Sequence, residues 1–563
     1  MKKKEKILIY QVFTRLYGNP VTLNKRGGTL AENGSAKMNG FTLARLRRIA
    51  ACGYTHIWYT GLIEHATATD YSACGIAPDN PLVVKGRAGS PYAIKDYYDI
   101  DPDLAEDVPH RMREFGRLVE RTHRAGLRMI MDFVPNHVAR QYASDARPAG
   151  VRDLGEDDDR EKAFAPDNNF YYIPGETLRT DFCPRVAEGA PYTETPARAT
   201  GNDRFDACPS RDDWYETVKL NYGVDYLGGR VCHFSPVPST WKKMTAILKY
   251  WAGKGADGFR CDMAEMVPAE FWDYAIAEVR RDFPDELFIA EIYNPASYRR
   301  YIAAGFDYLY DKVGLYDTLR AVVCGHASAS CVTGAWQSVD DIRGHMLNFL
   351  ENHDEQRIAS RFFAGAARRA FPAVAVSALM GTNPFMVYAG QELGEPAAAA
   401  EGFSGADGRT TIFDYWHVDT LSRLFALKKA GDERRLPEAE REAYDFYRRV
   451  TTLCRGSEAV AGGGFFDLQY ANYDRSHGYD CDRQYAFLRH SAGEKLLVVA
   501  NFAPEAVKVG VNIPAHAFEC AGLVAGERAA ADALGGRTQT LELRPDAPAF
   551  VEVEGCGAVA LRV

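Results

Sequence analysis

Three carboxylic side chains stand near the ends of short apolar stretches, where a protein can use them for chemistry. Asp262 ends "ADGFRCD", Glu291 lies in "LFIAEIY" and Asp354 lies in "ENHDEQR". Arg260 precedes Asp262 by two residues, so in a strand its guanidinium and the carboxylate point to the same face. One carboxylate of such a group can act as a nucleophile, and a neighbouring carboxyl group as general acid and base.

These residues must be brought together by the elements that carry them. Short apolar segments alternate with amphipathic segments whose apolar residues recur at helical spacing. Helices are expected over 41–53, 111–126, 240–255 and 268–283. Strands are expected over 6–13, 55–60, 127–134, 256–262, 287–293, 306–311, 345–351 and 383–390. Eight strands with helices between them predict an α/β fold, the (β/α)₈ TIM barrel.

Two regions depart from this alternation. Residues 138–220 are polar, contain many prolines and lack a clear helix, which predicts a small inserted domain after the third strand. After residue 457 the pattern is strands alone, which predicts a C-terminal antiparallel β-sandwich. The expected domains are a barrel over 1–137 and 221–457, the inserted domain over 138–220, and the sandwich over 458–563.

The barrel would place the carboxyl groups close together. In barrel enzymes the reactive side chains lie where strands end, at the C-terminal face. Asp262 and Glu291 lie at the C-terminal ends of the fourth and fifth strands, in "GFRCD" and "AEIY", and neighbouring strands lie roughly 4.8 Å apart. We therefore expect the two carboxyl groups at about 5 Å, the separation that retaining glycosidases use. Arg260 is expected to keep Asp262 ionised, because an adjacent positive charge favours the carboxylate.

Four segments resemble the signature motifs of the α-amylase family of glycoside hydrolases, family thirteen. They are "DFVPNH" (132–137), "GFRCD" (258–262), "AEIY" (290–293) and "ENHDEQ" (351–356). The resemblance covers the barrel from residue 7 to about 457. It implies Asp262 as the nucleophile and Glu291 as the acid/base. Asp354 would be the third carboxylate, which binds sugar hydroxyls and favours distortion of the ring.

The resemblance also implies a subsite for the sugar that is cleaved. Arg260, His137 and His353 would line this subsite, and Tyr92, in "GSPYAIKDYYDIDP", would stack on the sugar. No cofactor is required for the chemistry, and no metal ligand is assigned. A structural calcium ion is often held through the asparagine of the first motif, here Asn136. The alternative is that Asn136 only orders its loop by hydrogen bonds.

Three positions differ from patterns that are common in the family, and all three shape sugar subsites. They are Ser90, Ala93 and Glu265. Glu265 lies three residues after the nucleophile, where a lysine is frequent. Its charge would face the leaving-group side of the cleft, or it would form a salt bridge to a nearby loop. The motifs therefore predict the catalytic residues but not the substrate preference.

The leading hypothesis is a retaining hydrolase that cleaves α-1,4-glucosidic bonds in short α-glucan oligosaccharides through a covalent glycosyl-enzyme. A transglycosidase with the same three carboxylates is the first alternative, because only the acceptor site separates the two activities. A non-catalytic carbohydrate-binding relative is the second alternative. Such relatives lose the three carboxylates and carry a membrane helix, whereas this sequence has all three and shows no such helix.

Charge and composition argue against other partners. The 563 residues carry a net charge of −9 without a long basic run, which argues against nucleic acid and anionic membranes. The 12 cysteines include no C-x-x-C pair, so reduced thiols are expected rather than a disulfide scaffold or zinc ribbon. The N-terminal segment does not resemble a signal peptide, and a cytoplasmic location is expected. The oligomeric state is left open.

Overall fold

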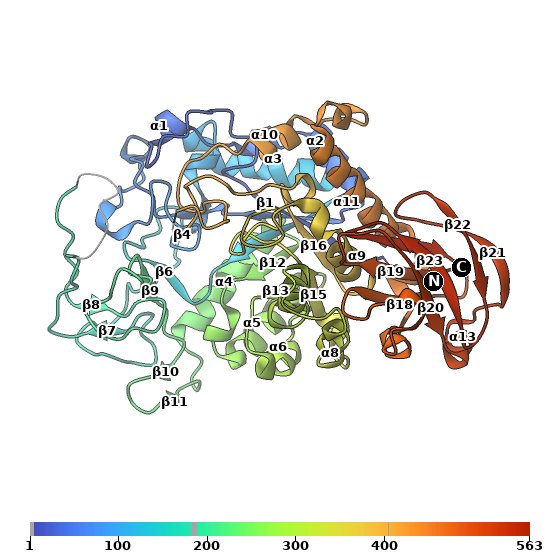
Figure 1. Cartoon of the computed structure of the whole chain (residues 1–563). Helices are drawn as coiled ribbons and strands as arrows, with labels where there is room; N and C mark the ends of the chain where they lie inside the picture. Colours follow the sequence, from blue (N-terminus) through green and yellow to red (C-terminus); the bar gives the residue numbers. More distant parts are fainter. Residues whose placement is uncertain (1–4, 182–188, 404) are drawn as a thin grey trace.

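Eight parallel strands close into a barrel, which confirms the predicted fold class (Figure 1). The structure is a computed structural model and describes residues 5–181, 189–403 and 405–563. The strands follow one another around the barrel in chain order, and the last pairs with the first. They are β1 (Leu8–Phe13), β2 (His56–Thr60), β5 (Arg128–Phe133), β12 (Gly258–Cys261), β13 (Leu287–Ala290), β14 (Tyr308–Tyr310), β15 (Met346–Phe349) and β16 (Phe385–Tyr388).

The register of β12 and β13 brings the predicted catalytic residues side by side. Gly258 begins β12, and a Cβ atom there would lie 2.8 Å from the Cβ of Leu287. The glycine therefore lets the two strands start in close contact. Parallel pairing then sets Cys261 opposite Ala290. Asp262 directly follows Cys261, and Glu291 directly follows Ala290. The two carboxyl residues therefore lie at the same level, at the C-terminal ends of neighbouring strands.

Helices cover the outside of the barrel (Figure 1). The four predicted helices are present as α2 (Leu43–Ala51), α3 (Arg111–Arg124), α4 (Ser239–Gly253) and α5 (Ala269–Asp282). The other helices of the barrel region are α1 (Leu30–Asn33), α6 (Tyr298–Ala303), α7 (Asp317–Val323), α8 (Cys331–Gln337), α9 (Phe371–Leu379), α10 (Asp419–Ala426) and α11 (Glu438–Gly456). Every residue of α9 is buried, because this helix contacts the barrel strand β15 and two C-terminal strands, β19 (Lys495–Asn501) and β24 (Gly557–Arg562).

An irregular insertion follows β5, and short antiparallel pairs hold it together. The pairs join β6 (His137–Ala139) to β9 (Thr217–Lys219), β7 (Tyr172–Ile173) to β8 (Ala197–Arg198), and β10 (Val224–Asp225) to β11 (Val231–Cys232). A further pair, β3 (Ile63–His65) with β4 (Ile94–Ile100), follows the second barrel strand. The β6–β9 pair matters most for the site, because it sets Lys219 opposite His137, close after the end of β5.

The C-terminal segment contains antiparallel strands in several small sheets. One sheet has four strands, β17 (Gly464–Asp467), β18 (Gln484–His490), β19 (Lys495–Asn501) and β24 (Gly557–Arg562). The segment also contains two separate two-stranded sheets. They pair β20 (Val507–Ile513) with β23 (Ala547–Val553), and β21 (Gly526–Ala531) with β22 (Thr538–Leu543). In β19, Leu496 and Val498 pack with the barrel core, whereas Leu497 and Val499 pack with the core of the C-terminal segment. Both faces are covered, which explains its continuous apolar sequence.

The prediction of strands alone after residue 457 is wrong at two places. A short helix α12 (Glu458–Gly462) follows α11, and α13 (Ala515–Ala521) interrupts the strands. α13 follows Pro514 and ends at Gly522, whose φ of +63° is the left-handed conformation that terminates helices. Seven residues complete two turns at most, which is too short for a helical period to stand out in sequence.

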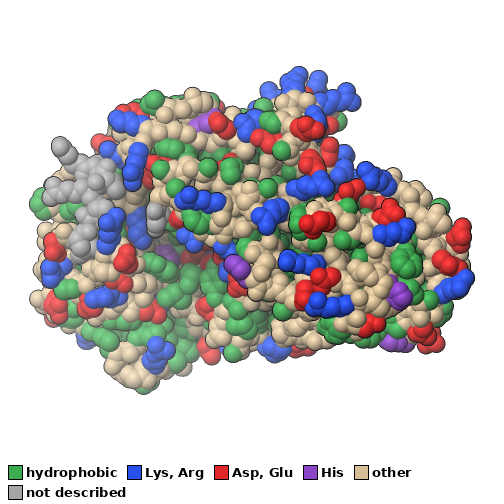
Figure 2. Space-filling view, in the orientation of Figure 1, with side chains coloured by type: hydrophobic (Ala, Val, Ile, Leu, Met, Phe, Trp, Pro, Cys, Tyr) green, Lys and Arg blue, Asp and Glu red, His purple; other side chains and the backbone are tan. Residues whose placement is uncertain are grey.

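The surface carries both signs of charge. On the face that Figure 2 shows, Lys and Arg side chains are mixed with Asp and Glu, without a continuous basic area. In the part of the chain that the structure describes, every helix is too short or too polar to cross a lipid bilayer. The cysteines of the same part are all unpaired thiols, as expected.

Candidate active site

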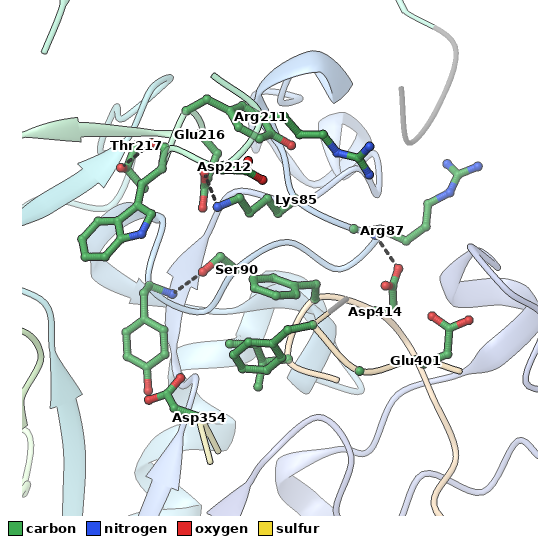
Figure 3. A pocket seen from close by; sticks show the side chains of 18 of the residues that line it. Lys85, Arg87, Ser90, Arg211, Asp212, Glu216, Thr217, Asp354, Glu401 and Asp414 are labelled. Carbon is green, nitrogen blue, oxygen red and sulfur yellow. Dashed lines mark hydrogen bonds and ion pairs between the residues drawn. The ribbon is translucent and has the colours of Figure 1, made fainter. Parts of the chain in front are cut away.

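A cleft of about 1280 Å³ opens at the C-terminal ends of the barrel strands. Asp262, Glu291 and Asp354 all line it, so the structure brings the three predicted carboxylates together. In Figure 3, Asp354 lies at one end of the residues drawn, away from Lys85, Glu216, Arg87 and Asp414, which also line the cleft. The volume exceeds that of most pockets for a single small ligand, roughly 300–1,000 Å³, and suits a chain of several sugars.

Arg260 joins the two carboxylates that were predicted to break the bond. Its Nη1 donates to Asp262 Oδ1 at 2.7 Å, and its Nη2 lies 2.6 Å from Glu291 Oε2. The guanidinium was expected beside Asp262, and the structure places it in contact with both residues. Arg260 is completely buried and does not line the cleft, in contrast to the prediction. The rings of Trp58, Tyr92 and Tyr310 surround it with centroids 5.4–5.6 Å from its Cζ.

Burial dominates the electrostatics of the carboxylates. It raises the pKa of Asp262 well above its ordinary value, and Arg260 opposes this rise. Burial, assisted by the charge of Glu291, raises the pKa of Asp354 to about 7. A fourth carboxylate, Asp132 of β5, lies 3.7 Å from Arg260 Nη1, and burial raises its pKa to about 6. Arg260 therefore opposes the effect of burial on these carboxylates without cancelling it, and the pKa of Asp262 stays raised, in contrast to the expectation that Arg260 keeps this carboxylate ionised.

Two residues that the sequence reasoning missed hold Glu291. Met263 has a φ of +42°, a left-handed conformation that is strained for a side chain of this kind, and its amide donates to Glu291 Oε2 at 2.8 Å. Tyr293 donates its hydroxyl proton to Glu291 Oε1 at 2.7 Å. Both Met263 and Tyr293 line the cleft. Their positions directly after Asp262 and two residues after Glu291 were the only available sequence signal.

Glu265 does not face the cleft, so the first of its two expected roles is not supported. Its Oε1 accepts from the amide of Tyr293 at 3.0 Å, and its Oε2 accepts from the amide of Asn294 at 3.1 Å. It is absent from the residues that line the cleft. Glu265 therefore contacts a nearby loop through backbone hydrogen bonds rather than a salt bridge, and this loop presents Tyr293 to Glu291.

We expect Glu265→Gln to lower kcat about tenfold, the effect of losing one hydrogen bond to a charged group, because one loop amide loses its carboxylate acceptor. The lengths of the products released from maltoheptaose should stay the same, since Glu265 does not contact the cleft. Glu270→Gln, an exposed change on the following helix, is the matched control and should leave both quantities unaltered. A shift in product lengths in Glu265→Gln would show that this side chain does reach the bound sugar.

His353 is buried and is not among the residues that line the cleft, in contrast to the prediction, but it contacts Asp354. Its Nε2 is 3.1 Å from Asp354 Oδ2, and its Nδ1 is 2.8 Å from Gln11 Nε2. Burial lowers the pKa of His353 well below its ordinary value, so the ring is neutral. Because the Gln11 amide donates to Nδ1, the ring proton is on Nε2, which contacts both Asp354 Oδ2 and the hydroxyl of Tyr92. Gln11, in the first strand, had no recognisable signal in the sequence.

Tyr92 and His137 line the cleft, as the prediction for a sugar subsite requires. The ring of Tyr92 stacks on that of His353, with centroids 5.2 Å apart and an interplanar angle of 25°. The ring of His137 lies 5.2 Å from that of Trp214, an aromatic residue of the insertion. Trp214, Phe403 and Phe413 also line the cleft and were not predicted, because nothing in the local sequence separates them from core aromatic residues.

With the Lys219 ammonium in place, the residues around Asn136 do not fit a calcium ion. Asn136 Oδ1 accepts a hydrogen bond from Lys219 Nζ, and Asn136 Nδ2 donates to the carbonyl oxygen of Gly201 at 2.8 Å. Both polar atoms of the amide are therefore used within the protein. In the described part of the chain, no three or more His, Cys, Asp or Glu side chains are placed to hold a metal ion together.

Comparisons with known proteins agree with this architecture. The family profile described as the α-amylase catalytic domain matches residues 31–177. The α-amylase MalA of Haloarcula japonica is 24% identical over 474 residues, which cover 82% of this chain and 54% of that protein. The chain thus spans about half the length of this curated relative.

Two further similarities extend the comparison. An α-1,4-glucan:maltose-1-phosphate maltosyltransferase of Cereibacter sphaeroides is 25% identical over 221 residues, which cover 38% of this chain and 23% of that protein. The crystal structure of the maltogenic α-amylase AmyB from Thermotoga neapolitana superposes with a TM-score of 0.62. It covers 99% of this chain and 98% of that protein at 20% identity, which shows a shared fold.

Proposed function

We propose that this chain, which belongs to the α-amylase family of glycoside hydrolases, hydrolyses α-1,4-glucosidic bonds in short α-glucans with retention of configuration. One observation carries the proposal. Asp262 and Glu291 follow paired residues of adjacent parallel strands, line one cleft and share the guanidinium of Arg260. This arrangement supplies a carboxylate nucleophile beside a second carboxyl group, as retaining hydrolysis requires.

The first step of the proposed reaction forms a bond between Asp262 and the anomeric carbon. Arg260 holds Oδ1, so we assign the attack to Oδ2. As the carbon–oxygen bond to the leaving sugar breaks, Glu291 gives that oxygen a proton. Oε2 of Glu291 accepts from Met263 and pairs with Arg260, which leaves Oε1, beside the Tyr293 hydroxyl, to carry the proton. The product of this step is a glycosyl ester of Asp262.

The second step returns the enzyme to its starting state. Glu291, now a carboxylate, takes a proton from a water molecule whose oxygen attacks the anomeric carbon. The ester bond to Asp262 breaks, and a second inversion restores the original configuration. Asp354, oriented by His353, would bind hydroxyls of the distorted sugar. Tyr92, Trp214 and Phe413 would provide apolar surfaces for the flat faces of sugar rings.

Transfer to a second sugar remains the alternative outcome of the same intermediate. It is favoured by the similarity of part of the chain to a maltosyltransferase. In that reaction a sugar hydroxyl takes the place of water. The non-catalytic alternative lacks support, because all three carboxylates line the cleft.

A proton NMR time course with maltotetraose tests the proposal. We expect the α-anomer of the new reducing end to form first, before mutarotation, because two inversions give net retention. Chromatography of the same samples should show products shorter than the substrate, whereas longer products would demonstrate transfer. Early formation of the β-anomer would exclude the paired roles of Asp262 and Glu291. Absence of turnover on maltotetraose, pullulan, cyclodextrin and starch alike would exclude the proposed function.

A further inference from the structure

A lysine ammonium lies at the asparagine through which the family often holds a calcium ion. Lys219 Nζ contacts Asn136 Oδ1, lies 2.7 Å from Asp203 Oδ1, and lies 3.3 Å from the carbonyl oxygen of Met266. We infer that these three oxygens form a cation site and that the chain fills it with its own Lys219, so that no calcium ion is needed to join the insertion to the barrel.

The site matches an ammonium group in number of donors, charge and shape. A lysine ammonium has three N–H donors and meets three oxygen acceptors. Its side chain is only 2% exposed, and the carboxylate of Asp203 balances its charge. The ring of Tyr226, with its centroid 5.6 Å from Nζ, covers another side. Calcium takes six to eight oxygen ligands, and a second positive ion beside Nζ would be repelled.

The ammonium connects three segments of the chain, two of which adjoin residues that line the cleft. Asn136 follows β5 and directly precedes His137, which lines the cleft. Asp203 belongs to the insertion, and Met266 ends the short 3-10 helix that follows Asp262. Lys219 itself ends β9, whose pairing with β6 places it opposite His137. Loss of the ammonium should therefore loosen both the insertion and the loop after the nucleophile.

The unmodified protein provides the first test. Its thermal midpoint Tm and its activity should be the same after dialysis against EDTA and after addition of millimolar CaCl₂. Isothermal titration calorimetry with CaCl₂ should show no binding. A fall in Tm on chelation that CaCl₂ reverses, or stoichiometric calcium binding, would overturn the inference. This outcome does not depend on which bond the enzyme cleaves, so it is separate from the test of function.

Two substitutions then separate the charge from the volume of the side chain. Lys219→Met keeps most of the volume but removes the donors, and should lower Tm by about 5 °C, as expected when one partner of a buried ion pair is lost. Added CaCl₂ should not restore it, because the methionine fills the site. Lys219→Ala leaves the three oxygens around an emptied space, and here millimolar CaCl₂ should raise Tm.

The matched control is Lys243→Ala. Lys243 also joins the barrel to the insertion, since its Nζ donates to the carbonyl oxygen of Asp153 at 2.7 Å and to Asn169 Oδ1 at 2.8 Å. Neither of these two contacts is to a carboxylate, so the Tm of the Lys243→Ala variant should not respond to calcium. An unchanged Tm in Lys219→Met, or a folded Lys219→Ala that ignores CaCl₂, would contradict the assignment of a cation site.

Discussion

Asp262→Asn is expected to lower kcat/KM on maltotetraose about 10⁴-fold or more, the loss seen when a group that acts directly on the reacting bond is removed. The amide is too weak a nucleophile to attack the anomeric carbon, and no ester can form. The fold should persist, because an asparagine oxygen can still accept from Arg260 Nη1. Steady-state kinetics measure kcat/KM, and a thermal unfolding curve shows whether the fold persists.

The matched control changes an aspartate at the opposite end of β12, the strand that Asp262 follows. Asp257 stands just before β12, where its Oδ2 accepts from the amide of Met129 at 2.7 Å. Asp257→Asn makes the same chemical change away from the cleft and should retain kcat/KM close to that of the unmodified enzyme. If Asp262→Asn kept comparable activity, another group would have to be the nucleophile. If both variants lost activity together, the loss would reflect the strand rather than the chemistry.

Glu291→Gln is expected to lower kcat on maltotetraose by a factor of about 10²–10⁴, the usual contribution of general acid–base catalysis. With α-maltosyl fluoride the first step should survive, because fluoride leaves without a proton. The second step should remain slow, since glutamine cannot activate water. The maltosyl ester of Asp262 should then accumulate, and mass spectrometry of proteolytic fragments should find the added maltosyl group on the peptide that contains Asp262.

Glu286→Gln provides the comparison for this variant. Glu286 is a buried glutamate at the opposite end of β13, immediately before the strand begins. Its substitution should leave turnover of both substrates unchanged and should trap no ester. Equal loss of activity on maltotetraose and α-maltosyl fluoride in Glu291→Gln would contradict the role of acid and base. A label on any carboxylate other than Asp262 would contradict the assignment of the nucleophile.

The sequence by itself determined the barrel and the positions of the reactive carboxylates. The reason is physical: each strand is buried on both faces and therefore reads as a short apolar run, and polar residues at its end have to lie at the barrel rim. Asp262, Glu291 and Asp354 were found in this way, and all three line one cleft. The short helix α13 was missed because seven residues contain too little periodicity.

Only the tertiary structure decided how these carboxylates are held. Arg260 pairs with both Asp262 and Glu291, and this depends on the register of β12 and β13. The contact of Glu265 with the loop amides depends on how that loop folds back after β13. Neither arrangement has a local pattern in the chain, because each joins residues whose spacing in sequence carries no information about their distance in space.

The partners of Asn136 likewise could not be predicted from the local sequence. Its motif predicted either a calcium ion or a loop held by hydrogen bonds, and the sequence left both open. The deciding residue, Lys219, lies 83 positions further along the chain. The antiparallel pairing of β6 with β9 brings it to Asn136, and burial then requires that its charge meet oxygen acceptors. Local sequence therefore specified which groups this protein has for chemistry, whereas long-range packing determined which partner each buried charge received.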